Sequence, residues 1–99
     1  RGLYFAEASS KSDEYATPHE GLCCMILCRV VCGNINYSDH VSPPVQELAD
    51  SVLKHRTHHS VLGDREKCRG TYREFIIFNN AQVYPEYLIT YKRVFASGP

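Results

Sequence analysis

One stretch of seven residues, 72–78, constrains the fold of this 99-residue chain more than any other. Its sequence, Tyr-Arg-Glu-Phe-Ile-Ile-Phe, is rich in aromatic and β-branched residues and predicts a strand. Because successive side chains of a strand point to opposite faces, one face carries Tyr72, Glu74, Ile76 and Phe78. A carboxylate beside apolar neighbours is costly without partners. Glu74 is therefore either a functional residue of a central strand or a strand-end glutamate that reaches solvent.

Weaker patterns predict the other strands and the loops. Strands are expected at residues 3–6, 22–32, 58–62 and 87–95. The second of these is apolar on both faces, which predicts a buried strand. Connections are expected as a polar loop at residues 63–70, a turn at Asn79-Asn80 and a linker that holds Pro85.

Two segments predict short helices. Ser10 and Asp13 fit a capping box with Ser10 at the cap, so a short helix should follow through about Tyr15 and end near Pro18. Residues 45–54 carry apolar side chains at helical spacing. Strands and helices do not alternate regularly, as they do in a doubly wound sheet. The expected fold class is therefore α+β, with mainly antiparallel strands and one or two short helices.

Composition argues against two classes of partner. The 11 basic and 11 acidic residues give a formal net charge of zero, and no Lys/Arg stripe is present, so direct nucleic-acid binding by this segment is not expected. No run of about 18 apolar residues exists, so no membrane span is expected. The chain enters strand-like sequence directly after Arg1, without an initiator Met or a signal peptide, which leads us to expect a cut through a larger fold.

Four of the five cysteines are crowded into ten residues: Cys23, Cys24, Cys28 and Cys32. Disulfide frameworks favour even counts and wider spacing, so reduced thiols and an intracellular location, nuclear or cytoplasmic, are expected. On a strand, the spacing of four residues spans about 13 Å, too far for one tetrahedral zinc. On a helix the same spacing would be compatible with a metal. We expect core cysteines and no metal site, with a Cys/His metal-binding module as the alternative.

A second group of candidate residues lies near the N-terminus. Ser12 and Tyr15 are three residues apart, so they share one face of the first expected helix. An aromatic ring beside a hydroxyl suits a planar ligand that carries an amide. A solvated helix face is the other interpretation of this pair.

Five blocks, in order, resemble the catalytic domain of poly(ADP-ribose) polymerases. Gly2-x-Tyr4-Phe5-Ala6 followed by Ser10-Lys11-Ser12-x-x-Tyr15 resembles the nicotinamide-pocket segment of that family. Residues 72–78 resemble the strand that holds the family's catalytic glutamate. The remaining blocks are residues 28–34 and 58–63, which match further landmarks, and residues 81–91, which resemble the tankyrase ending.

This resemblance implies an ADP-ribosyltransferase fold, of which residues 1–99 would form the C-terminal half. It also implies NAD⁺–protein ADP-ribosyltransfer, poly or mono, in which ADP-ribose passes from NAD⁺ to protein acceptors and nicotinamide is released. NAD⁺ is then a consumed substrate and no permanently bound cofactor is expected. Glu74 and Tyr4, the tyrosine of the family's His-Tyr-Glu triad, would be catalytic. The nicotinamide-binding residues would be Gly2, Tyr4, Phe5, Ala6, Lys11, Ser12, Tyr15 and Glu74.

The resemblance also assigns separate roles within this pocket. Ser12 would bind the carboxamide, Tyr15 would stack on the nicotinamide ring, and Lys11 would lie at the rim. Glu74 would bind the hydroxyls of the nicotinamide ribose and orient the acceptor. A glutamate at this position leaves polymer formation possible, whereas family members without it are limited to single transfer or are inactive.

Some family features are expected to be missing. The triad histidine and the donor loop lie upstream of the Gly-x-Tyr-Phe-Ala motif in the family, and none of the five histidines occupies the triad position. His59 is expected to be structural. Residues 16–21, where tankyrases carry a zinc site, form a short loop with only His19. An inactive truncated fragment or a non-catalytic NAD-pocket or regulatory binding module is therefore the alternative to an active enzyme.

Overall fold

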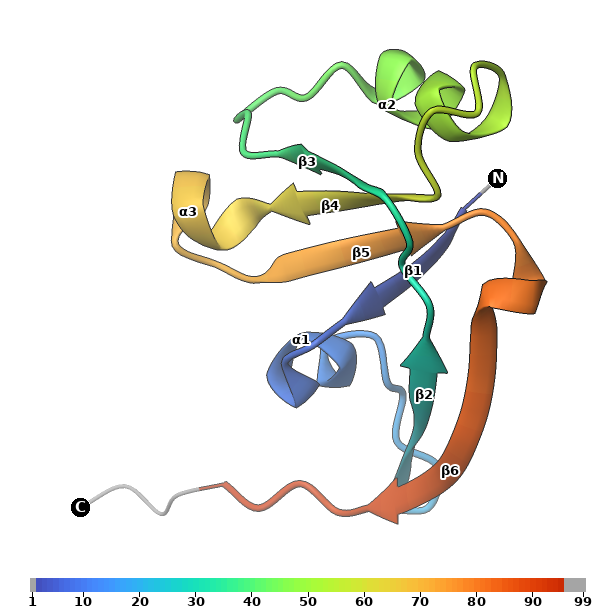
Figure 1. The fold of residues 1–99 in the computed structure, drawn as a ribbon. Helices are drawn as coiled ribbons and strands as arrows, with labels where there is room; N and C mark the ends of the chain where they lie inside the picture. Colours follow the sequence, from blue (N-terminus) through green and yellow to red (C-terminus); the bar gives the residue numbers. More distant parts are fainter. Residues whose placement is uncertain (1, 96–99) are drawn as a thin grey trace.

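Residues 2–95 are described by a computed structural model, in which six strands form two sheets (Figure 1). The larger sheet has the order β1-β5-β4-β3, with strands Leu3–Ala6, Arg73–Ile77, Ser60–Asp64 and Ile35–Ser38. β3 and β4 are parallel, and the other neighbouring pairs are antiparallel. The smaller sheet is an antiparallel ribbon of β2, Cys23–Val30, and β6, Val83–Tyr91. The expected α+β class with mainly antiparallel strands is confirmed.

β5 is a central strand, as its sequence predicts. It pairs with β1 on one edge and with β4 on the other. The core of this sheet is small and centres on Ile77, Val61 and Leu62, which are 0%, 1% and 4% exposed. Burial of these side chains removes apolar surface from water, and this fixes the register of the strands because a slip of one residue would turn them to the opposite face.

The β3–α2–β4 unit forms the parallel edge of the sheet. Parallel strands need a crossover connection, and α2, Val45–Leu53, supplies it. The amide of Asn36 on β3 donates to the hydroxyl of Ser51 on α2 at 3.0 Å, which ties the helix to the sheet. The predicted helix at residues 45–54 is confirmed. The sequence did not predict β3, because a run of four residues has little periodicity of its own.

The predicted loop at residues 63–70 is wrong, because this segment holds the end of β4 and a helix, α3, from Arg65 to Arg69. Asp64 caps the helix by accepting a hydrogen bond from the Lys67 amide at 3.1 Å. Gly70 ends it in the left-handed conformation, with φ of 71°. The described residues thus contain three short α-helices, where one or two were expected.

The predicted capping box is also wrong. Helix α1 runs from Ser9 to Asp13, with Ala8 in the extended conformation at its N-cap and no side-chain cap bond. Ser10 therefore lies inside the helix, where its hydroxyl cannot cap the first turn. Held in place by neither a cap nor a long helical run, α1 depends on tertiary contacts for its position.

The β2–β6 ribbon lies on the side of β1 and α1, away from α2 (Figure 1). β6 starts four residues before the predicted strand, so Pro85 lies within it and not in a linker. The register passes from Leu27–Tyr87 to Cys28–Pro85, so Glu86 is an extra, bulged residue. A bulge is one of the few places where a strand tolerates proline, which lacks the amide donor.

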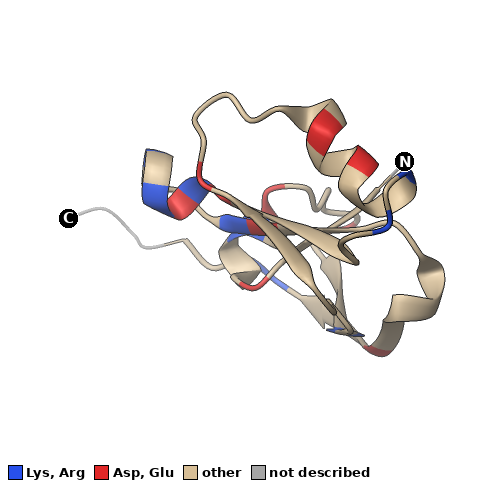
Figure 2. Cartoon of the chain, turned by 45° about the horizontal axis from the view of Figure 1, so that its top comes forward, with Lys and Arg blue, Asp and Glu red and all other residues tan. Residues whose placement is uncertain are grey.

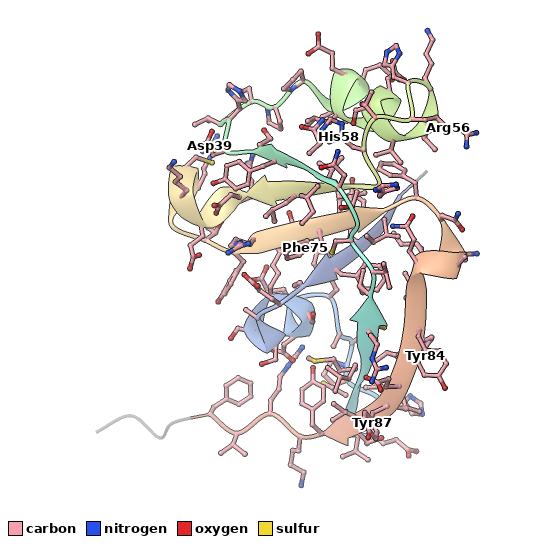
Figure 3. All side chains as sticks on the ribbon, viewed as in Figure 1. Asp39, Arg56, His58, Phe75, Tyr84 and Tyr87 are labelled. Atoms are coloured by element: carbon pink, nitrogen blue, oxygen red, sulfur yellow. The ribbon has the colours of Figure 1, made fainter. Side chains whose placement is uncertain are left out.

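The prediction that β2 is buried is wrong. Within β2 only Cys23 is buried, at 1% exposed, and Ile26 and Leu27 are 58% and 50% exposed. Tyr84 and Tyr87 of β6 also project into solvent (Figure 3). Among residues 2–95, few side chains of other elements pack on the ribbon. The apolar side chains of β2 therefore remain largely exposed. The expectation of core cysteines holds for Cys23 alone, since Cys24 is exposed and Cys28, Cys32 and Cys68 are half-buried free thiols.

The radius of gyration, 15.6 Å, exceeds the roughly 13 Å of a compact domain of this length, in keeping with this open arrangement. Basic and acidic segments are interspersed along the chain and lie side by side on α3 (Figure 2). The absence of direct nucleic-acid binding remains a prediction. None of the helices between residues 2 and 95 is long and apolar enough to cross a membrane.

Candidate functional site

Strand β1, helix α1 and the central strand β5 meet around an open cavity of about 600 Å³. Its lining residues are Tyr4, Phe5, Ala6, Lys11, Ser12, Tyr15 and Glu74. These are seven of the eight site residues expected from the sequence. The fold therefore brings Glu74 to residues that precede it by about sixty positions or more, and it does so through the antiparallel pairing of β1 with β5.

Gly2 lies just before β1 and outside the lining of this cavity. A Cβ at Gly2 would overlap Cγ2 of Ile76 and come within 3.2 Å of the Phe78 ring. Glycine thus allows the start of β1 to approach β5 closely. This packing is a structural reason for glycine at that position, separate from any contact with a ligand.

The carboxylate of Glu74 stays accessible although its strand is central. Its partner on β1 is Ala6, and its partner on β4 is Gly63. Cross-strand partners project from the same face of a sheet, about 5 Å away. Two of the smallest residues therefore flank Glu74, and the side chain is half-buried rather than covered. This arrangement leaves space for a ligand on both sides of the carboxylate.

Lys11 supplies a cation at the edge of the cavity. Its ammonium lies 3.4 Å from Glu14 Oε1 and 5.3 Å from the centre of the Tyr15 ring. Desolvation lowers the pKa of Lys11, but the hydrogen bond to Glu14 and the negative charges of Glu74 and Glu14 together outweigh it, so the pKa is raised. Lys11 therefore stays charged at neutral pH and partly balances the two carboxylates.

Two tyrosine rings at the cavity are open to solvent. Tyr4 is 66% exposed and Tyr15 is 74% exposed. A planar ligand could stack on such a ring and so remove its apolar surface from water. No side chain of the described residues covers these rings to that extent. Ser12 lies in the same lining and offers a hydroxyl that can donate and accept hydrogen bonds.

The position of α1 is set by a cluster around Asp13, which we call the Asp13 clamp and which comprises Asp13, Tyr91 and Arg93. The Tyr91 hydroxyl donates to Asp13 Oδ1 at 2.5 Å, and Arg93 Nε donates to Oδ1 and Oδ2 at 2.9 and 3.1 Å. The hydrogen bond from Tyr91, and then that from Arg93, lower the pKa of the Asp13 carboxyl. The same bond to Asp13, with a contribution from burial, raises the pKa of Tyr91 to about 12. Sequence reasoning missed this cluster, because its partners are about eighty residues apart.

Glu74 and Lys11 also border a second cavity, of about 340 Å³, on the side of α3. Its other lining residues are Glu14, Arg65, Arg69, Thr71 and Tyr72. The two arginines were missed as neighbours of Glu74 because their segment was expected to be a loop. The Asp64 cap and Gly70 were the sequence signals that could have revealed the helix.

The sequence also predicts that His59 is a structural residue and that no metal site is present. His59 Nδ1 accepts from the Asn34 amide at 2.8 Å, and its ring packs against Gly33, where φ is 62°. It thus holds a turn, as expected of a structural residue. Within residues 2–95, no three His, Cys, Asp or Glu side chains are grouped so that they could hold a metal ion. The absence of a metal site remains a prediction.

Two comparisons with known proteins bear on this cavity. The family model of the poly(ADP-ribose) polymerase catalytic domain matches residues 1–93. A protein of Dictyostelium discoideum described as a probable poly [ADP-ribose] polymerase is 34% identical over 95 residues. That match covers 93% of this chain and 24% of the relative, so the chain spans about a quarter of the relative's length. The blocks that carry the sequence resemblance, and all residues that line the cavity, lie inside the region that the family model matches.

Proposed function

This chain belongs to the poly(ADP-ribose) polymerase catalytic-domain family, and from that premise we propose that its β1–α1–β5 cavity binds the nicotinamide end of NAD⁺. The protein then transfers ADP-ribose from NAD⁺ to protein acceptors and releases nicotinamide. The observation that carries this proposal is the meeting of Glu74 with five residues of β1 and α1, and with Tyr15 just after α1, around one open cavity.

The chemistry of the lining suits this ligand. The ring of Tyr15 stacks on the planar nicotinamide, and the hydroxyl of Ser12 pairs with its carboxamide. An exposed tyrosine gains from this contact, since its ring is otherwise in water. A hydroxyl that hydrogen-bonds the amide also disfavours ring compounds that lack one. Tyr4, on β1, lines the same cavity.

Glu74 acts on the bond between nicotinamide and ribose. When this bond breaks, its electron pair leaves with nicotinamide, and positive charge develops on the ribose, as it does in glycoside hydrolysis. A carboxylate nearby stabilises that charge more in the transition state than in the ground state. The acceptor then forms a bond to the same ribose carbon and loses a proton. The small neighbours Ala6 and Gly63 give the sugar access to the carboxylate.

We propose further that residues 1–99 form the C-terminal half of the catalytic domain. The openness of the cavity and the exposure of Tyr4 and Tyr15 support this division, because other residues must cover a bound dinucleotide. The same exposure is the observation that favours the alternative, a non-catalytic NAD-pocket module. The two differ in one respect: the module binds nicotinamide but does not release it from NAD⁺.

The test is substitution of Glu74 in the natural full-length protein. Glu74→Gln keeps the size of the side chain but removes the charge that faces the developing cation. The rate of nicotinamide release should fall on the order of 10²–10³-fold. Nicotinamide affinity should change far less. Release is followed by chromatography, and modified protein is followed on gels.

The matched control is Glu47→Gln, which removes a glutamate from the first turn of α2, outside the cavity. Its rate should remain near that of the wild type. A Glu74→Gln rate within a few-fold of the wild type would contradict the proposed role of Glu74. A folded wild type that binds nicotinamide but releases none from NAD⁺ would support the binding module.

A further inference from the structure

We propose that Arg93, acting through the Asp13 clamp, is a positioning residue that places Ser12 and Tyr15 for nicotinamide binding. This inference rests on the proposed function, because it concerns the same cavity. It adds to that function Arg93, a residue about eighty positions from α1 that does not line the cavity.

Helix α1 cannot place these two side chains alone. It has five residues, no side-chain cap bond and no buried residue. Helix formation has a costly nucleus, so a helix of this length is unstable unless other parts of the protein hold it. Ser12 lies in its last turn, and Tyr15 follows it in the next turn, where its amide donates to the Ser12 carbonyl at 3.1 Å. The position of both side chains therefore depends on what holds the C-terminal end of α1.

Arg93 holds that end at three groups. Its Nε donates to both carboxylate oxygens of Asp13. One terminal nitrogen, Nη2, donates to the carbonyl oxygens of Asp13 and Ala16, both at 2.9 Å. Asp13 and Ala16 bracket Tyr15 in the chain, so one guanidinium fixes the backbone on both sides of it. A cation at the last carbonyls of a helix also matches the helix dipole.

The clamp is itself anchored to the core through β6. Tyr91 is the last residue of this strand, and its cross-strand partner on β2 is Cys23, which is 1% exposed. The Tyr91 hydroxyl donates to Asp13 from this fixed position. The β2–β6 ribbon, which lies beside α1 (Figure 1), thus determines where the ligand-binding turn lies.

The geometry requires arginine at position 93. A guanidinium presents five donors in a rigid plane, whereas the ammonium of lysine is a compact charge with three rotating donors. Lysine could pair with the Asp13 carboxylate, but it could not also reach both carbonyl oxygens in the same geometry. Arg93→Lys should therefore restore only part of what Arg93→Ala loses.

The experiment measures nicotinamide affinity of the natural full-length protein by isothermal titration calorimetry, with Arg93→Ala, Arg93→Lys, Tyr15→Ala and the Arg93→Ala/Tyr15→Ala double variant. Arg93→Ala should weaken binding on the order of 10-fold, within the range of coupling between residues of one network. The nicotinamide affinity of Arg93→Lys should lie between those of Arg93→Ala and the wild type. In the Tyr15→Ala background, Arg93→Ala should have a much smaller effect, because the side chain that it positions is gone.

The matched control is Arg29→Ala, which removes another long-range ion pair, from Arg29 to Glu86 at 2.8 Å on the ribbon. This pair involves neither α1 nor a residue that lines the cavity, so nicotinamide affinity should stay close to that of the wild type. The thermal unfolding midpoint of every variant is measured alongside. A merely structural role for Arg93 would lower the midpoint without the coupling to Tyr15.

Several outcomes would overturn the proposal. Unchanged nicotinamide affinity in folded Arg93→Ala would do so, and so would an effect that adds in full to that of Tyr15→Ala. If Arg93→Ala does not fold, affinity of Arg93→Lys equal to that of the wild type decides against it. A folded wild-type protein without nicotinamide affinity would instead contradict the proposed function, and this inference would fall with it.

Discussion

Replacing Asp13 with alanine should return the phenol of Tyr91 toward the ordinary tyrosine range. In the intact protein, the hydrogen bond to Asp13, followed by burial, raises the pKa of Tyr91 from 10.0 to about 12. At pH 11 a phenol with a pKa of 10 is about 90% ionised, and one with a pKa of 12 is about 10% ionised. The Asp13→Ala variant should therefore carry up to about 0.8 more phenolate per molecule at pH 11 than the wild type.

The sign of the associated stability change follows from the direction of this shift. A tyrosine whose folded pKa is raised stabilises the fold fully below pH 10, and this contribution is lost as the pH rises through about 12. The assay is a spectrophotometric titration at the phenolate absorption band, with circular dichroism to show that each protein is folded at each pH. The pKa of Tyr37 is also raised to about 12, so the titrations of Tyr37 and Tyr91 overlap. The difference between the wild type and Tyr91→Phe isolates the contribution of Tyr91. Superimposable wild-type and Asp13→Ala curves up to pH 11.5 would show that Asp13 does not raise the pKa of Tyr91, and would contradict the hydrogen bond between them on which the Asp13 clamp depends.

The remaining predictions concern stability. Ile77→Ala should lower the free energy of unfolding by about 2–5 kcal/mol, because Ile77 is 0% exposed. Val94→Ala, at a site that is 90% exposed, should change it by less than about 0.5 kcal/mol in the same urea titration. The hydrogen bond from Tyr37 to Asp64, at 2.5 Å, is the main cause that lowers the pKa of the Asp64 carboxyl. This hydrogen bond stabilises the fold above about pH 4, and the stabilisation is lost as the pH falls through the pKa of Asp64 in the folded protein. When the pH is lowered from 6 to 2, the thermal unfolding midpoint of Asp64→Asn should therefore fall less steeply than that of the wild type.

Local signals in the sequence predicted several elements. The alternation of residues 72–78 predicted β5, and the apolar spacing of residues 45–54 predicted α2. These predictions succeed because the period of a helix or a strand repeats within the segment itself. The same reasoning fails for α3, because the polar residues of its segment also fit a loop, although the cap at Asp64 and the end at Gly70 are present in the sequence.

The apolar run of β2 led to a wrong expectation for another reason. Apolar residues show that burial would be favourable, but they do not show whether a covering layer exists. In residues 2–95 the ribbon leaves Ile26 and Leu27 largely exposed. Burial belongs to the arrangement of whole elements, so a single segment cannot specify it.

The candidate site also combines features that the sequence predicts with features that depend on how the chain packs. The sequence predicts which chemical groups are available: a glutamate in a strand, a serine and a tyrosine three residues apart, and the motifs shared with a family. The meeting of Glu74 with Tyr4, Ser12 and Tyr15 in one cavity can be seen only in the folded chain. The folded chain likewise places Ala6 and Gly63 beside that carboxylate and Arg93 on the end of α1. Covalent structure and local periodicity act over a few residues, whereas pairing between strands and hydrogen bonds across about eighty residues form only when the chain packs.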